Sequence, residues 1–228
     1  MTKNLKDIYS GVNKADKNRR TNDFYPTPPL AVWCLNKYSD VPKNIIEPCA
    51  GRGNISIELK RNNKTVFSRD LHEYENSLVD IETGFDVLNS PIHEIATGLI
   101  TNPPYHKDLP RKIAQLGIDN YDYTALLVRL TFLEGKKRRK LFNKHPPSQI
   151  IIFSDRLKFG EFDDREPIEQ EEQIGGMICY MWIVWDKRAA AETKVKWISL
   201  EDEYSSWRSH YDQIRDANKI LPEAPRDT

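Results

Sequence analysis

The amino-acid sequence predicts an α/β protein with a mostly parallel sheet that is covered by helices on both faces. Two observations support this prediction. Short apolar runs of strand length alternate with helix-like stretches from residue 23 to residue 187, which is the order that parallel strands with crossover helices require. Several of these runs also end in glycine, proline, aspartate or asparagine, which is typical of strands where loops begin.

The elements can be placed in order along the chain. The first helix is expected within residues 24–38, because Thr27 can cap it and Pro28 suits its first turn. Further helices are expected over residues 55–62, 110–120 and 135–144, the last of them basic. Strands are expected within residues 44–54, 64–71, 84–89, 98–105, 123–132, 148–155 and 176–187.

The sequence divides into three parts. Residues 1–22 are predicted to be a flexible basic arm, residues 23–187 the main domain, and residues 188–228 a C-terminal helical extension. Within the main domain, residues 161–176 are expected to form a mobile acidic loop. Residues 161–172 contain seven acids against one arginine, so this segment is too polar for the core.

The C-terminal extension carries an aromatic stripe. Apolar side chains recur every three or four positions and so share one helical face, namely Trp197, Leu200, Tyr204, Trp207, Tyr211 and Ile214. Ser199 and Asp202 resemble a capping box in front of this helix. The stripe is expected to pack on the main domain or to form the interface of a homodimer, since an exposed stripe would favour aggregation.

Composition narrows the class of protein. The 228-residue chain has a formal net charge of zero, which does not indicate a protein that wraps duplex DNA, although local patches can still bind phosphates. Cys34, Cys49 and Cys179 are far apart and odd in number, so no disulfide framework, zinc site or other metal site is expected. No apolar run suits a signal or membrane segment, and a cytoplasmic protein without membrane contact is predicted.

A glycine loop, EPCAGRGN at residues 47–54, follows the first predicted strand. Gly51 and Gly53 allow a tight turn and the close approach of a ligand. Asp70 ends the next strand, where a carboxylate pairs with ribose hydroxyls, and Asp86 ends the third, where it can accept from an exocyclic amine. The loop lacks the third glycine of dinucleotide sites and the ending of phosphate loops. A nucleoside that bears a cationic group, such as S-adenosylmethionine, fits these residues best.

The stretch GLITNPPYHKD at residues 98–108 ends another predicted strand with Asn102, two prolines and Tyr105. In open α/β sheets, ligands bind beyond the carboxyl ends of strands, at the point where strand order reverses. If this strand and the strand of the glycine loop are neighbours there, both loops face one crevice. His106 is expected only to border that pocket.

With these motifs the chain resembles the S-adenosylmethionine-dependent methyltransferases that modify exocyclic amines, above all the N6-adenine methyltransferases. Their Asn/Asp-Pro-Pro-Tyr/Phe signature is present at residues 102–105, and their F-x-TP-like element is matched by Tyr25-Pro26-Thr27-Pro28. The glycine loop precedes the NPPY motif, as in one subclass. The resemblance covers residues 23–186 and implies a Rossmann-like class I methyltransferase fold, with a seven-stranded, mostly parallel sheet whose last strand is antiparallel.

The resemblance also implies a reaction and its residues. The cofactor is S-adenosyl-L-methionine, and the acceptor is the N6 amine of an adenine flipped out of DNA. The implied catalytic residues are Asn102, Pro103, Pro104 and Tyr105. The implied cofactor-binding residues are Tyr25, Thr27, Glu47, Cys49, Ala50, Gly51, Gly53, Asp70, Leu71, Asp86, Val87 and Asn102.

The chemistry explains why such a motif is needed. An adenine N6 amine is a poor nucleophile, because its lone pair is delocalised into the ring. Two acceptors aimed at its hydrogens favour a more tetrahedral nitrogen and spread the developing positive charge. The Asn102 side-chain oxygen and the Pro103 carbonyl are expected to be this pair, held in place by the prolines. Tyr105 is expected to stack on the base.

Residues outside the motifs are expected to contact the nucleic acid. Phe159 sandwiches the flipped base or simply packs, and Arg156 contacts phosphate or pairs with an acid. The basic stretch with Lys136, Lys137 and Arg138 is a phosphate track or a solvated helix face.

Alternative functions stay open at this point. DNA is favoured over RNA as the partner, and the absence of a large target-recognition domain predicts a short or relaxed recognition site. Methylation of RNA adenine, protein glutamine or cytosine N4 uses similar motifs. A catalytically inactive module that binds nucleic acid is the alternative outside the enzymes.

Overall fold

The computed structural model describes residues 25–160, 168–190 and 192–220, the last of these with side chains to residue 214. The predicted arm and residues 161–167 of the acidic loop lie outside this part of the chain. The described strands are β1 (Asn44–Glu47), β2 (Thr65–Ser68), β3 (Gly98–Thr101), β4 (Tyr123–Arg129), β5 (Gln149–Phe153), β6 (Tyr180–Asp186) and β7 (Lys194–Ile198). They confirm the predicted α/β class.

These seven strands of the described chain form one sheet in the order β2-β1-β3-β4-β6-β5-β7. β6 is antiparallel to both of its neighbours, and all other pairs are parallel. The mostly parallel sheet is therefore confirmed, with its antiparallel strand at the expected residues. β6 is not the last strand, however, because β7 follows it and pairs with β5 at the edge.

Two expectations about the strands are wrong. Residues 84–89 form turns in place of a strand, since the Asp86 carboxylate accepts from the backbone N–H of Leu88 and from the side chain of Asn89 and so turns the chain. Conversely, β7 lies in the part that was expected to be helical. Its sequence KVKWI does not show the apolar run of a buried strand, because an edge strand can expose lysine side chains to solvent.

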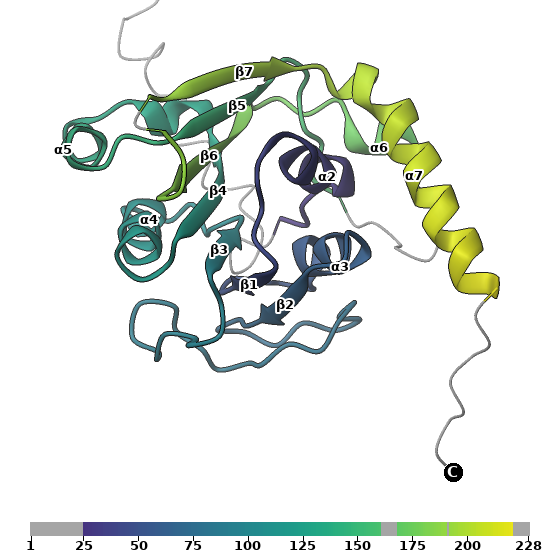
Figure 1. Cartoon of the computed structure of the whole chain (residues 1–228), viewed down its shortest axis with the longest axis horizontal. Helices are drawn as coiled ribbons and strands as arrows, with labels where there is room; N and C mark the ends of the chain where they lie inside the picture. Colours follow the sequence, from purple (N-terminus) through teal and green to yellow (C-terminus); the bar gives the residue numbers. More distant parts are fainter. Residues whose placement is uncertain (1–24, 161–167, 191, 221–228) are drawn as a thin grey trace, which may run out of the picture.

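Helices cover both faces of the sheet (Figure 1). One face carries α2 (Pro29–Tyr38), α3 (Asn54–Arg61) and α7 (Leu200–Ile220), and the other carries α4 (Leu109–Asn120) and α5 (Lys136–Lys144). A short 3₁₀ helix, η4 (Leu130–Leu133), and a one-turn helix, α6 (Gln170–Gln173), complete the described helices. Buried side chains such as Leu35 and Trp182 fill the first layer, and Ile113 and Met181 fill the second.

Helix α7 packs on α2, as the first of the two interpretations of the aromatic stripe expects (Figure 1). Leu200 and Trp207 are almost fully buried against the domain, so this part of the stripe is covered within the chain and leaves little apolar surface for a homodimer. The Ser199 hydroxyl accepts from the backbone N–H of Asp202, as a helix cap does. Trp197 is not part of the stripe: it lies on β7 and is 66% exposed.

Part of the predicted acidic loop belongs to the core. Ile168 and Gln173 are buried. The Gln173 side chain accepts a hydrogen bond from the backbone N–H of Leu30 at 3.0 Å and donates to the Ile168 carbonyl. The expectation that this segment stays out of the core is therefore wrong for Ile168 and Gln173, whereas Glu169, Glu171 and Glu172 are exposed. A glutamine that satisfies buried backbone groups does not show in the composition of a polar segment.

Replacing Gln173 with alanine should destabilise the protein by about 1–3 kcal/mol, because the buried N–H of Leu30 would lose its acceptor. Urea unfolding measures this change. The matched control is Glu172→Ala on the same turn, which is exposed and should cost less than about 0.5 kcal/mol. Equal effects of the two substitutions would contradict the proposed role of Gln173.

Candidate active site

The order of the strands reverses between β1 and β3. From β1 the chain passes to β2 on one side, and then crosses to β3 on the other side of β1. Ligand sites of open α/β sheets lie at the carboxyl ends of such a pair. A cavity of about 680 Å³ is found there, so the glycine loop and the NPPY loop face one crevice, as the sequence predicts.

Most of the predicted cofactor residues line this cavity. They are Tyr25, Thr27, Glu47, Cys49, Ala50, Gly51, Asp70, Leu71, Asp86, Val87 and Asn102, and Pro104 joins them. His106 borders the cavity, as expected. Lining residues to which the sequence assigns no role are Pro26, Pro48, Asn54, Ile55, His72, Tyr74, Phe85, Leu88 and Leu109. Nearly all of these residues lie within three positions of a predicted site residue in the sequence. Proximity to the motifs is therefore the signal that could have identified them.

The remaining predicted residues do not line the cavity. These are Gly53, Pro103, Tyr105, Phe159, Arg156, Lys136, Lys137 and Arg138. Gly53 is needed for packing: it has φ 88°, and a Cβ atom there would lie 2.5 Å from the side chain of Val79. Gly53 is therefore needed for the close approach of Val79, which lies in the connection between β2 and β3.

Asp70 holds the glycine loop in shape. Its Oδ2 atom accepts from the backbone N–H of Gly51 at 2.7 Å, and its Oδ1 atom accepts from that of His72 at 2.9 Å. Gly51 has φ 58°, which glycine adopts without strain. A carboxylate has about four lone-pair sites, so Asp70 keeps acceptor capacity toward the cavity after these two bonds.

Glu47 is the most deeply buried acid of the cavity, with 1% of its surface exposed. It accepts a hydrogen bond from the Ser56 hydroxyl, which also contacts the Ser68 hydroxyl at 2.6 Å. Burial raises the pKa of Glu47 well above its usual range, and the hydrogen bonds from Ser56 offset this only in part. The environment of Glu47 therefore favours the neutral form of the carboxyl group more than water does.

Two further polar groups shape the cavity wall. Asn54, at the start of α3, is buried, and no described residue hydrogen-bonds to its side-chain oxygen. Such an orphaned acceptor fits a donor on a ligand. Burial, and then the Asp70 carboxylate, raise the pKa of the Cys49 thiol, so Cys49 is a neutral wall residue and not a nucleophile.

The Asn102 side chain is fixed in one orientation. Its Nδ2 atom donates to the Tyr25 carbonyl at 3.2 Å and to the Thr27 hydroxyl at 3.1 Å. A carbonyl can only accept, so the NH₂ group must lie on this side. The Oδ1 atom then faces the Tyr105 hydroxyl, which donates to it. The orientation of the Asn102 amide, at the wall of the cavity, is therefore set by three neighbours.

Two roles differ from the sequence argument. Thr27 does not cap α2, because the cap position is Pro28 and no side chain caps this end. Its hydroxyl instead holds Asn102. Tyr105 does not face the cavity as a stacking platform: its hydroxyl also contacts the Leu127 carbonyl at 3.1 Å, and Arg129 lies over its ring. Tyr105 instead holds the Asn102 side chain through its hydroxyl group.

Phe159 closes an aromatic group beside the cavity. Its ring lies 6.3 Å from that of Tyr25, edge to face, and 4.7 Å from that of Tyr180. The expected roles of Phe159 are to sandwich the flipped base or to pack within the protein, and these ring contacts are packing contacts. Arg156 donates to the carbonyl of Met177, and it pairs with no acid among the residues that the structure describes.

No protein-family model matches the chain, and no curated protein matches its sequence. A solved structure of a Listeria monocytogenes protein, assigned to the class I S-adenosylmethionine-dependent methyltransferases, is 14% identical. The match has a TM-score of 0.52 and covers 92% of this chain and 77% of that one. The chain therefore has the class I methyltransferase fold.

Two other solved structures match more weakly. A Pyrococcus horikoshii protein assigned as an RNA methyltransferase has a TM-score of 0.46 and 14% identity, over 84% of this chain and all of that one. The 23S rRNA methyltransferase ErmE has a TM-score of 0.49 and 9% identity, over 74% and 72%. Matches at this level do not bear on the substrate. Over the described ranges, no group of three or more His, Cys, Asp or Glu could hold a metal ion, and no helix could span a membrane.

Proposed function

We propose that the protein transfers a methyl group from S-adenosylmethionine to the N6 amine of an adenine in DNA. The observation that carries this proposal is the fixed amide of Asn102, a residue that lines the same cavity as the glycine loop and Asp70. An aimed acceptor and a nucleoside site in one cavity are what methyl transfer to an exocyclic amine requires.

The residues of the cavity fit the cofactor. Asp70 has acceptor capacity for ribose hydroxyls, Leu71 and Phe85 offer apolar surface for a base, and the unpartnered Asn54 oxygen can accept from an amino group. A volume of about 680 Å³ is in the range of cofactor sites. When bound, the cofactor supplies an electrophilic methyl group on a sulfonium.

The protein's own residues prepare the amine for attack. The Asn102 oxygen accepts from an N6 hydrogen, which helps to spread the positive charge that develops on the nitrogen. Tyr25, Thr27 and Tyr105 keep the Asn102 amide from rotating. Asparagine takes no proton, and the cationic amine loses its proton to water after transfer.

Cofactor affinity should depend on pH through Glu47. The pKa of Glu47 is raised in the free protein, and a cationic ligand nearby favours the carboxylate. Between the lower pKa of Glu47 in the complex and its raised pKa in the free protein, binding must then release a proton. In this interval affinity should rise by up to about tenfold per pH unit, and it should level off above the raised pKa. Calorimetry in buffers of different ionisation enthalpy measures the released proton.

The matched variant for this test is Glu47→Gln, which keeps the shape of the side chain and cannot titrate. Its affinity should be lower and should show no such rise with pH. If wild type and variant followed the same pH profile, Glu47 would not be the coupled group.

A labelled-cofactor assay tests the proposed function. The protein is incubated with tritiated S-adenosylmethionine and with single-stranded DNA, duplex DNA, RNA or protein, and the products are digested and separated. N6-methyladenine from DNA is the expected product. Label in RNA instead of DNA would move the proposal to RNA, and no N6-methyladenine on any nucleic acid would reject it.

A further inference from the structure

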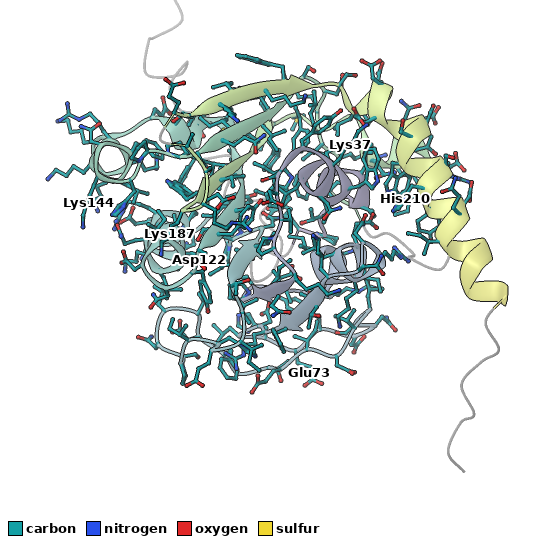
Figure 2. The ribbon with its side chains drawn as sticks, viewed as in Figure 1. Lys37, Glu73, Asp122, Lys144, Lys187 and His210 are labelled. Carbon is teal, nitrogen blue, oxygen red and sulfur yellow. The ribbon has the colours of Figure 1, made fainter. Side chains whose placement is uncertain are left out.

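A basic groove runs along helix α5, outside the cavity described above. Lys136, Arg139, Lys140 and Asn143 are spaced by three and four residues, so they share one face of the helix and line this groove. The groove has a volume of about 810 Å³. Side chains of α5 project away from the body of the molecule, with Lys144 near its end (Figure 2).

Most of the positive charge of this groove is uncompensated in the part of the chain that the structure describes. Helix α5 holds six basic residues and no acid. Arg138 donates to the backbone carbonyls of Glu134 and Thr131, and Lys137 lies 3.7 Å from the Asp108 carboxylate. Lys136, Arg139 and Lys140 form no ion pair within the described residues. Three adjacent uncompensated charges repel one another and attract an extended anion.

The groove opens beside the candidate active site. Helix α5 begins just after the carboxyl end of β4, at the same edge of the sheet as Asn102. The turn into the helix uses Gly135, with φ 104°. Asp108, which Lys137 contacts, stands in sequence between the cavity residues His106 and Leu109. Asp108, the residue before α4, thus links the groove residue Lys137 to the part of the chain that lines the cavity.

We propose that this groove binds the phosphate backbone of the nucleic-acid strand whose adenine enters the cavity. The inference rests on the proposed function for the choice of ligand. Residues 136–143 extend over about 10 Å of helix, and one strand of a duplex carries a phosphate about every 3.4 Å of its axis, so the groove spans about three phosphates. The apolar Leu133 and Phe142 at its wall suit the sugars between them.

Binding of a short fluorescein-labelled DNA tests the proposal, by fluorescence anisotropy at about 50 to 200 mM KCl. The test variant combines Lys136→Gln, Arg139→Gln and Lys140→Gln. The control variant combines Lys60→Gln, Lys187→Gln and Lys194→Gln, which removes the same charge from exposed lysines at the opposite edge of the sheet. Both are measured without cofactor, next to wild type.

The test variant should bind at least about tenfold more weakly at low salt. The slope of log K against log[KCl] should fall by about 2 to 3, one for each phosphate that the variant no longer neutralises. The control variant should stay within about threefold of wild type. Equal effects of the two triple variants, or an unchanged salt slope, would overturn the proposal.

This result is separate from the proposed function. If the groove variant lost DNA binding while wild type methylated no nucleic acid, the proposed phosphate site would be supported and the proposed reaction would be rejected. If wild type methylated DNA while the groove variant bound it normally, the proposed reaction would be supported and the proposed phosphate site would be rejected.

Discussion

Replacing Asn102 with alanine is expected to lower kcat for methyl transfer by about 10²–10³, the cost of removing one aimed charge-stabilising group. The cofactor affinity should fall far less, because the Asn102 oxygen binds the amine of the acceptor. Single-turnover transfer of labelled methyl measures the first quantity, and calorimetry with S-adenosylmethionine measures the second. Thermal unfolding of the variant shows whether it is folded under the assay conditions.

Two variants control for this effect. Tyr105→Phe removes only the hydroxyl that contacts Asn102, so the amide keeps its bonds to Tyr25 and Thr27, and kcat should fall by about tenfold. Asn120→Ala removes an exposed asparagine of α4 and should leave kcat unchanged. The proposed role of Asn102 fails if its alanine variant retains wild-type kcat while the protein methylates DNA.

Replacing Asp70 with alanine is expected to have the second largest effect, on cofactor affinity. Two buried or half-buried N–H groups, of Gly51 and His72, would be left without a charged acceptor. Each unsatisfied group costs about 1–3 kcal/mol, so the glycine loop should lose its shape and the affinity for S-adenosylmethionine should fall by about 10²-fold or more. Calorimetry and urea unfolding measure the two consequences.

The substitution Asp70→Asn separates the two proposed roles of this carboxylate, which are to stabilise the glycine loop and to bind the cofactor. It keeps one carbonyl acceptor, so stability should recover in part, whereas an acceptor pair for ribose hydroxyls is gone and affinity should stay low. Asp80→Ala, at an exposed aspartate, is the control and should change neither quantity. Unchanged affinity in Asp70→Ala would remove Asp70 from the cofactor site.

The sequence predicts the central features of the fold because they rest on strong local signals. Apolar runs mark β4 and β6, and the glycine and proline loops mark the carboxyl ends of β1 and β3, whose pairing the structure confirms. The roles of the cavity residues remain proposals, although the cavity collects nearly all of those assigned to the cofactor.

Other features depend on contacts between residues far apart in the chain. Nothing local tells that Thr27 holds Asn102, 75 residues away, or that Gln173 bonds Leu30, 143 residues away. The strand β7 is not predicted from the sequence, because its lysines interrupt the apolar pattern of a strand. Arg138 shares the sequence context of its basic neighbours, and only the fold around Gly135 turns its guanidinium back onto the backbone.

The bond between Gln173 and Leu30 has a consequence for how this chain could diversify. Thr27, which holds Asn102, and Leu30, which holds Gln173, are three residues apart in one stretch of chain. Thr27 lies in the wall of the cavity, whereas Leu30 is fully buried in the core. Natural variation in this short stretch would therefore be restricted from two sides, by the segment that carries Gln173 and by the amide of Asn102.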